Sequence, residues 1–397
     1  MRIALAHKRL DQNGGTERDL YRTAEGLRDL GHEIHLFCGQ YGVKPPHRTV
    51  AHRVPVVPLG RTARLWSFAI LAPTMIRRYH CDVVVSFGRM IYQDVLRSGG
   101  GSHKLFLQKM SQENGVWRCL WQSASVYHQS LLAIEKRQFQ AGHYKTILAV
   151  SDIVKQELMS TYSVPQEKIA LIYNGVDHER FHPSLRGKFR DTVRKQWGIP
   201  SNAPVVLFVG SGFRRKGLDR LFKAWSSPRL KGAYLLVVGD DAQRRRYRVR
   251  AETEANGRVV FAGRRGDVEA YYGAADLVAL PAVQEAFGNV VLEALACGLP
   301  VIVSKAVGAS ELLRGVLTGG IVSQPEDSVE LEAKLVFMLD QSRRVSCSEE
   351  ARKLAEEYSW RNYFRRLETH LQEVAGQDCA WAHVVAPSSA SRSGRAR

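Results

Sequence analysis

The sequence predicts an α/β protein built from two Rossmann-like, doubly wound domains that face each other across a cleft. Two observations lead to this fold class. The chain has 397 residues, more than one ordinary hydrophobic core accommodates. Short apolar runs of strand length alternate with helical patterns in two separate series. Such strand–loop–helix repeats are typical of parallel sheets that are covered by helices on both faces.

The first series begins with the apolar run Arg2–Ala6. A turn at Asn13-Gly14-Gly15 then leads into a helix expected over Thr16–Leu30. Four more strands are expected at His32–Cys38, Cys81–Phe87, Thr146–Val150 and Ile169–Tyr173. We assign residues 1–180 to an N-terminal domain.

A polar, basic segment with several prolines follows, and we interpret residues 181–203 as an interdomain linker. The C-terminal domain is expected over residues 204–375, and its final helix either stays there or returns to the N-terminal domain. Residues 376–397 are expected to form a disordered tail, because the segment from Ala386 onward is rich in Ser and Arg with no apolar period. The strands of the second series are expected at Val205–Val209, Tyr234–Val238, Val259–Ala262, Leu277–Leu280 and Val301–Ser304.

Composition narrows the class of protein and its compartment. The net charge of +18 attracts nucleic acid, anionic lipid or phosphorylated substrates without choosing among them. Six widely spaced cysteines with no CxxC pair argue against a disulfide scaffold or a zinc site and favour a reducing cytosol. The N-terminus has no signal-peptide pattern, and the apolar run Leu65–Ile76 is shorter than the ~20 residues that span a bilayer. The chain is therefore expected in the cytoplasm.

The most specific motif follows the strand Leu277–Leu280, where ligands of open α/β sheets bind. Glu285 lies in the loop before a helix, and Glu293 lies two turns along that helix. The N–H groups of the turn Ala286-Phe287-Gly288 are expected to point outward at the positive end of the helix. Two glutamates at this spacing alone favour a solvated helix face. The flanking Phe-Gly and Gly-Leu-Pro-Val sequences favour a site that binds sugar and ribose hydroxyls.

Two Gly-rich loops are further candidates. The first follows Val205–Val209 and brings Arg215 and Lys216 to the start of the helix Leu218–Trp225. A basic loop at a helix N-terminus binds anions, although it is also compatible with a solvated surface loop. In the second, Gly14-Gly15-Thr16-Glu17-Arg18-Asp19, Thr16 and Asp19 fit a capping box. That box needs no glycine pair, so the pair favours close approach of a ligand to the backbone.

The segment from Glu285 to Glu293, E-A-F-G-N-V-V-L-E, resembles the E-x7-E signature of glycosyltransferase family 4. Members of that family have the two-domain GT-B architecture, and the resemblance covers roughly residues 2–375. Within the family, the chain is most similar to the lipopolysaccharide core glucosyltransferases that act on heptose.

The resemblance implies roles for individual residues. Glu285 would bind the donor sugar as a catalytic residue and Glu293 the nucleotide ribose. Arg215 and Lys216 would bind the donor diphosphate. The residues that would complete the donor site are Gly15 and Asp19, beside the phosphates, and the turn Ala286, Phe287 and Gly288.

Two positions depart from the family pattern or match it loosely. Many members carry Arg where this chain has Ser211, so one phosphate contact is either missing or supplied by Arg214. Many members also carry a functional His near the reacting sugar in the first domain. His103, after Gly99-Gly100-Gly101-Ser102, is the best match, and we take it as a second catalytic candidate. A lone histidine is more often structural, so both alternatives stay open.

The implied activity is a retaining, metal-independent transfer of a hexose, with glucose from UDP-glucose expected. The acceptor would be a lipopolysaccharide core or similar lipid-linked glycan bound by the N-terminal domain. The nucleotide sugar is a co-substrate, so no cofactor is expected. No metal site is expected either, because the Asp-x-Asp motif of metal-dependent glycosyltransferases does not occur.

The basic, aromatic stretch Lys104–Gln140 suits an anionic membrane surface. It equally fits a helix that turns its aromatic side chains inward. Together with the lipid-linked acceptor, it predicts a peripheral protein on the inner face of the cytoplasmic membrane.

Three other functions compete. A sugar-nucleotide epimerase of the same architecture is the nearest enzymatic alternative, although the E-x7-E helix favours transfer. A basic nucleic-acid-binding protein would fit the charge, but no helix-turn-helix, zinc spacing or RNA-binding aromatic motif is present, so no nucleic-acid partner is expected. An NAD-dependent oxidoreductase would need G-x-G-x-x-G after the first strand, where only Gly14-Gly15 occurs.

Overall fold

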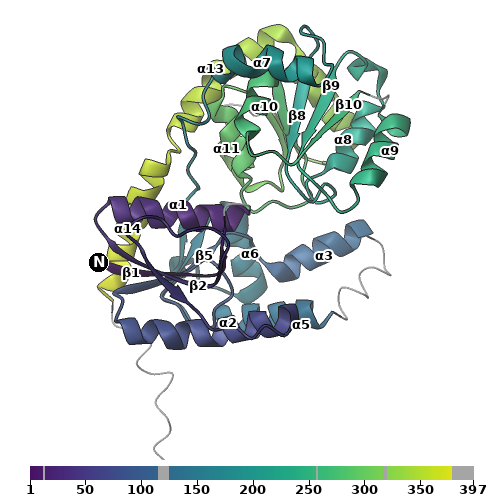
Figure 1. The fold of residues 1–397 in the computed structure, drawn as a ribbon. Coiled ribbons are helices and arrows are strands. Elements are labelled where there is room, and N and C mark those ends of the chain that lie inside the picture. Colours follow the sequence, from purple (N-terminus) through teal and green to yellow (C-terminus); the bar gives the residue numbers. More distant parts are fainter. Residues whose placement is uncertain (12–13, 115–124, 256–257, 314, 316–319, 378–397) are drawn as a thin grey trace, which may run out of the picture.

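The protein contains two parallel, doubly wound α/β sheets (Figure 1), which confirms the predicted fold class. The computed structural model describes residues 1–11, 14–114, 125–255, 258–313, 315 and 320–377. The tail expected to be disordered lies almost entirely outside these residues. No helix in the described part of the chain combines the length and apolar character needed to span a bilayer.

The N-terminal sheet has seven strands in the order β3-β2-β1-β4-β5-β6-β7, all parallel. Its strands are β1 (Arg2–Leu10), β2 (Glu33–Tyr41), β3 (Val50–Arg53), β4 (Val83–Ser86), β5 (Val95–Ser98), β6 (Thr146–Ala149) and β7 (Ile169–Leu171). Its helices are α1 (Gly15–Asp29), α2 (Gly60–Ile76), α3 (His103–Asn114), α5 (Val126–Gln138) and α6 (Asp152–Tyr162).

The C-terminal sheet has six parallel strands in the order β10-β9-β8-β11-β12-β13. Its strands are β8 (Val205–Val209), β9 (Tyr234–Val238), β10 (Val259–Gly263), β11 (Leu277–Leu280), β12 (Val301–Ser304) and β13 (Ile321–Val322). Its helices are α7 (Leu185–Gln196), α8 (Leu218–Trp225), α9 (Arg244–Glu254), α10 (Val268–Ala274), α11 (Asn289–Ala296), α12 (Ser328–Leu339) and α13 (Gln341–Glu356).

The last helix, α14 (Trp360–Ala375), returns to the N-terminal sheet (Figure 1). Its buried side chains Tyr363, Leu367 and Leu371 join the cluster that contains Leu5 of β1 and Leu20 of α1. These apolar positions recur at helical spacing, so one face of α14 is removed from water. The chain therefore crosses between the two sheets twice.

The structure differs from the sequence prediction at several elements. The segment 181–203 is not an open linker, because it contains α7, which packs against α10 of the C-terminal sheet. Strands β3, β5 and β13 were not predicted. Helix α1 begins at Gly15 after the N-cap Gly14, with no side-chain cap, so Thr16 and Asp19 do not form the capping box that was the structural alternative for this turn. The domain limits at residues 180 and 204 stay a prediction.

Candidate active site

The candidate donor site lies where the strand order of the C-terminal sheet reverses. Strands β8 and β11 are neighbours at this switch point, and the loops after them run in opposite directions. Ligands of open α/β sheets bind in the crevice that such loops leave. The loop after β8 carries Arg215 and Lys216, and the loop after β11 carries Glu285. The two motifs found separately in the sequence therefore meet at one sheet edge.

Glu285 is held by both cations of the neighbouring loop. Its Oε2 accepts a hydrogen bond from Nη1 of Arg215 at 2.8 Å and lies 3.3 Å from Nζ of Lys216. Burial alone would raise the pKa of Glu285, but the charges of Lys216 and Arg215 lower it below the ordinary value for glutamate. Glu285 is therefore ionised at neutral pH, in a position fixed by two cations.

Lys216 reaches Glu285 by crossing Gly210, the residue that follows β8. A Cβ atom on Gly210 would lie 2.4–2.8 Å from the last three atoms of the Lys216 side chain. Gly210 also has a φ of 143°, which strains any other residue. Glycine at this position therefore leaves room for the lysine side chain and also allows the backbone turn.

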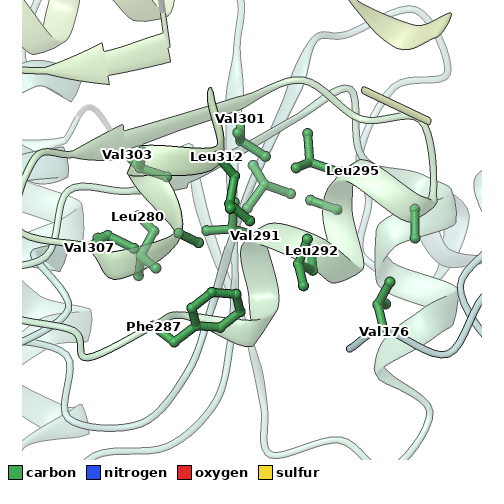
Figure 2. Packing of buried hydrophobic residues seen from close by; sticks show 14 of the residues in the cluster. Val176, Leu280, Phe287, Val291, Leu292, Leu295, Val301, Val303, Val307 and Leu312 are labelled. Carbon is green, nitrogen blue, oxygen red and sulfur yellow. The ribbon is translucent and has the colours of Figure 1, made fainter. Parts of the chain in front are cut away.

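The turn Ala286-Phe287-Gly288 places three N–H groups before helix α11. None of the three donates a hydrogen bond to another described residue. The Phe287 side chain is 2% exposed and packs with Val291 and Val307 beneath the turn, as Figure 2 shows. Gly288 has a φ of 92°. Phe287 anchors the turn, and its three N–H groups lie at the positive end of α11, while their contact with a donor stays a prediction.

Glu293 lies within α11, whereas Glu285 precedes this helix, and the two carboxylates have different partners. Its Oε1 accepts from Nη2 of Arg18 in α1 at 3.2 Å, and its Oε2 accepts from the hydroxyl of Tyr272 in α10 at 2.8 Å. The Arg18 contact joins the two sheets. Burial and the neighbouring Glu293 raise the pKa of the Tyr272 hydroxyl, so this group stays a proton donor.

Asp19 lies in a buried network rather than at the surface of a cleft. It is 4% exposed, and its Oδ2 accepts from Nη2 of Arg97 at 2.8 Å. The same nitrogen of Arg97 donates to Asn174, which in turn donates to Asn289 at the start of α11 at 2.7 Å. Asn289 completes the ring with a 3.4 Å contact to Asp19. The network fixes α1 against α11, and a direct contact of Asp19 with a donor stays a prediction.

A cavity of about 350 Å³ lies at the carboxyl edge of the N-terminal sheet. Thr16 and Glu17 of α1, the glycines 99–101 and His103 contribute to its lining. Gly15 precedes these α1 residues, and the space around its missing Cβ is open. The geometry therefore leaves room beside Gly15, while its predicted contact with donor phosphates stays a prediction.

His103 begins α3 on the wall of this cavity. Its backbone N–H donates to Glu135 at 2.9 Å, and its Nε2 lies 3.1 Å from Nδ1 of His128. Burial, followed by the charge of Arg89, lowers the pKa of His103 to about 4. The imidazole is therefore neutral at physiological pH.

Glu157 of α6 connects the wall of this cavity to the loop that carries Glu285. Its Oε1 accepts from the amide of Gln284, next to Glu285, at 3.0 Å and from Lys109 at 2.9 Å. Its Oε2 accepts from the backbone of Ser102 at 3.3 Å, and a Cβ on Gly101 would lie 2.6 Å from that oxygen. Gly101 also has a φ of 69°, a backbone conformation that favours glycine whether or not a ligand approaches.

Several residues of the site were not found from the sequence. Arg18, Tyr272 and Asn289 contact Glu293 or Asp19 through pairings that no local motif encodes. The buried position of Arg97 could have been predicted. An arginine next to apolar residues in a short buried run needs a carboxylate partner. Among the described residues, no group of three or more His, Cys, Asp or Glu side chains is placed to share a metal ion.

Comparison with known proteins identifies both halves of the chain. Residues 13–180 match the model of "Glycosyltransferase Family 4", and residues 189–354 match that of "Glycosyl transferases group 1". The lipopolysaccharide glucosyltransferase WaaG of Escherichia coli K12 is 27% identical over 86% of this chain and 91% of the relative.

Solved structures agree. The crystal structure of WaaG, a glycosyltransferase involved in lipopolysaccharide biosynthesis, has a TM-score of 0.79 at 26% identity and covers 94% of this chain and all of WaaG. Anabaena HepE in complex with UDP-glucose has a TM-score of 0.70 at 20% identity, covering 94% of this chain and all of HepE, which is likeness of fold alone. This chain is therefore a GT-B glycosyltransferase that belongs to glycosyltransferase family 4.

Proposed function

We propose that this glycosyltransferase transfers glucose from UDP-glucose, with retention of configuration, to a lipopolysaccharide core or similar lipid-linked glycan. The observation that carries the proposal is the cluster of Glu285, Arg215 and Lys216 beside the open N-terminus of α11. The choice of glucose and of a lipid-linked acceptor is supported by the similarity to WaaG along most of the chain.

The cluster suits a sugar diphosphate. Arg215 and Lys216 supply charge for the diphosphate, and the N–H groups of residues 286–288 supply donors. A phosphate that enters would share both cations with Glu285, whose carboxylate can then accept hydrogen bonds from sugar hydroxyls. We assign Glu293, which Arg18 and Tyr272 hold by hydrogen bonds, to the ribose hydroxyls.

Transfer with retention needs no protein nucleophile in this arrangement. The bond between the anomeric carbon and the diphosphate oxygen breaks, and the acceptor oxygen bonds to that carbon on the same face. The acceptor proton passes to the leaving phosphate oxygen. Arg215, Lys216 and the α11 N-terminus stabilise the charge that develops on the diphosphate. Transfer should therefore persist in EDTA, and activity that EDTA abolishes and Mg²⁺ restores would contradict this step.

The acceptor is assigned to the cavity of the N-terminal sheet that His103 lines. A neutral imidazole can accept or donate one hydrogen bond to a sugar hydroxyl. We take His103 as a residue that contacts the reacting sugars, with its nitrogen released from His128 when substrate binds.

The membrane assignment is carried by helix α3. Lys104 and Gln108 are exposed there and Leu105 and Leu107 are half-buried, so α3 presents a mixed basic and apolar surface. Other residues of the predicted membrane-binding stretch contact other groups of the protein. Lys109 is paired with Glu157, and Tyr127 packs inward beneath Arg61. Residues 115–124, with Trp117, Arg118, Leu120 and Trp121, lie outside the described residues.

A panel of UDP-, GDP- and ADP-sugars tests the donor, because a ligand that binds the native state raises the unfolding temperature by mass action. UDP-glucose should give the largest shift. Proton NMR of the product with UDP-glucose should then show an α-linked glucose, as in the donor. A β-linked product, or a larger shift with another nucleotide sugar, would contradict the proposal.

A further inference from the structure

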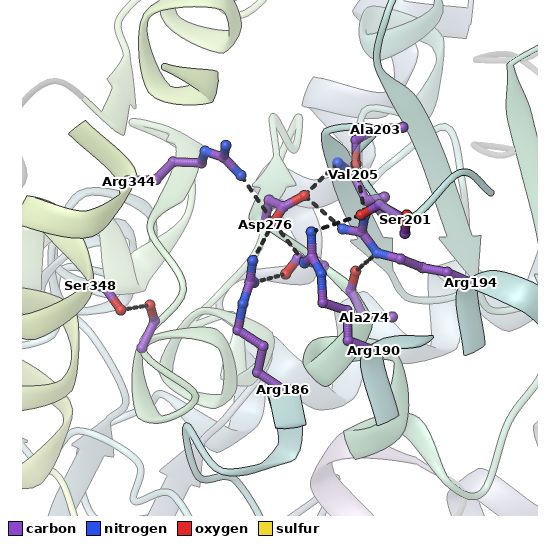
Figure 3. A network of polar contacts seen from close by, with 12 residues as sticks. Arg186, Arg190, Arg194, Ser201, Ala203, Val205, Ala274, Asp276, Arg344 and Ser348 are labelled. Carbon is purple, nitrogen blue, oxygen red and sulfur yellow. Dashed lines mark hydrogen bonds and ion pairs between the residues drawn. The ribbon is translucent and has the colours of Figure 1, made fainter. Parts of the chain in front are cut away.

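The unusual feature outside the donor site is one carboxylate surrounded by four arginines. Asp276 precedes β11, and its side chain is 1% exposed. Its Oδ1 accepts from Arg186 at 3.0 Å and from Arg190 and Arg344 at 2.9 Å each. Its Oδ2 accepts from Arg194 at 2.8 Å and from the backbone of Val205 at 2.9 Å, so both oxygens are saturated (Figure 3).

The cluster carries an excess of positive charge. In the described part of the chain, Asp276 is the only carboxylate within ion-pair distance of these four guanidinium groups. Arg194 is 1% exposed and also donates to the carbonyl groups of Ala274, Ser201 and Ala203. Its role is structural. The other three arginines are between 20% and 49% exposed and keep donors for a ligand.

These three arginines line a cavity of about 420 Å³, together with His182, Tyr272 and Ser348. That volume falls in the range of about 300–1,000 Å³ that is typical of small-molecule sites. The Nε atom of Arg344 is buried at the cavity and has no hydrogen-bond partner among the residues that the structure describes. A buried donor without a partner is costly unless a ligand or water satisfies it.

The cavity lies apart from Glu285 and the basic donor loop, although Tyr272, which lines the cavity, also donates to Glu293. Asp276 lies at the amino end of β11, whereas Glu285 follows its carboxyl end, so the two sites lie at opposite edges of the sheet. Guanidinium groups bind phosphate oxygens through paired N–H donors. We propose that the cavity between α7 and α13 binds a small, soluble phosphate compound through Arg344, Arg190 and Arg186.

Pyrophosphate is the probe, titrated by calorimetry into the full-length protein. Arg344→Gln should weaken its binding about 10-fold or more, as expected for a charge-assisted hydrogen bond. Asp276 keeps three arginines in this variant, so the fold should persist. The matched control is Arg343→Gln, which removes the neighbouring charge, placed over the ring of Phe337 instead. Arg186→Gln provides a second test at the most exposed of the three.

The donor loop is a competing anion site, so the titration is repeated in Arg215→Ala/Lys216→Ala protein. Binding that persists there and is lost on adding Arg344→Gln supports the proposal. Pyrophosphate binding that disappears with Arg215→Ala/Lys216→Ala, or that Arg344→Gln leaves unchanged, overturns it. Binding to phosphatidic acid vesicles without any binding of free pyrophosphate also overturns it, because the arginines would then serve a lipid surface.

Discussion

Arg18 of α1 donates a hydrogen bond to Glu293 of α11, with 3.2 Å between Nη2 and Oε1, and so joins the two sheets of the protein. The charge of Glu293 is the largest cause of the raised pKa of Arg18. Tyr272 holds the second carboxylate oxygen. The residue proposed to bind ribose is therefore oriented before a nucleotide arrives, and such preorganisation lowers the cost of binding.

Glu293→Gln keeps the shape of the side chain and removes its charge. We expect about 10- to 100-fold weaker binding of UDP, the loss of one hydrogen bond to a charged group. Binding of 2′,3′-dideoxy-UDP, which lacks the ribose hydroxyls, should be unaffected. Calorimetry of both nucleotides measures the difference, with Glu332→Gln on α12 as the control. An equal loss of affinity for both nucleotides would show that Glu293 does not bind the ribose hydroxyls.

Arg215→Ala and Lys216→Ala should each weaken UDP binding more than uridine binding. Each variant removes a cation placed for the diphosphate, a contribution of about 1.5–3 kcal/mol. The exposed Lys223→Ala, on the adjacent helix α8, tests the effect of net charge alone and should bind both ligands normally. Equal losses of UDP and uridine in the loop variants would indicate a folding defect.

Lys104→Glu should reduce sedimentation with anionic vesicles, and the remaining binding should fade with added salt. One basic residue near an anionic surface contributes about 1 kcal/mol, or about five-fold in partitioning. Lys231→Glu makes the same charge change at an exposed position of the C-terminal domain and should have little effect. If wild-type protein binds neutral and anionic vesicles alike, or neither, the membrane assignment fails.

Asp276 should give the protein an acid-sensitive component of stability. Burial would raise its pKa, but the charges of Arg194 and Arg190 dominate and lower it from 3.8 to about 2. A lowered pKa in the folded state stabilises the protein above pH 3.8, and this contribution is lost as the pH falls toward 2. The shift corresponds to about 2 kcal/mol in the free energy of unfolding.

Urea unfolding at several pH values tests this component. The stability difference between wild-type protein and Asp276→Asn should shrink by about 2 kcal/mol between pH 5 and pH 2. The exposed Asp191→Asn on α7 should follow the wild type throughout. A difference that stays constant over this range would mean that the arginines do not favour the ionised carboxylate.

The sequence predicted elements whose signal is local. Helix α8 spans Leu218–Trp225 as expected. Strand β5 was missed because Arg97 interrupts its short apolar run. The arginine can be buried there because it pairs with Asp19, a contact that the local sequence does not show. Helix α7 was missed because its arginines suggest a solvated linker, whereas three of them converge on Asp276.

The same limit applies to the candidate site. The loops with Lys216 and Glu285 were predictable because each follows an apolar strand, and parallel strands bring their carboxyl ends to one edge. The pairing of Arg18 with Glu293, 275 residues apart, depends on how the two sheets meet. No spacing within either segment encodes that contact.

The central claim is that Glu285 acts on the donor sugar, and turnover of UDP-glucose by Glu285→Gln tests it most directly. The variant should fold, with an unfolding temperature near that of the wild type, because Arg215 and Lys216 each lose one ion pair and neither cation is fully buried. Its kcat for release of UDP in the presence of acceptor should fall about 10- to 100-fold, while Glu332→Gln keeps wild-type turnover. Unchanged kcat in folded Glu285→Gln protein would contradict the account.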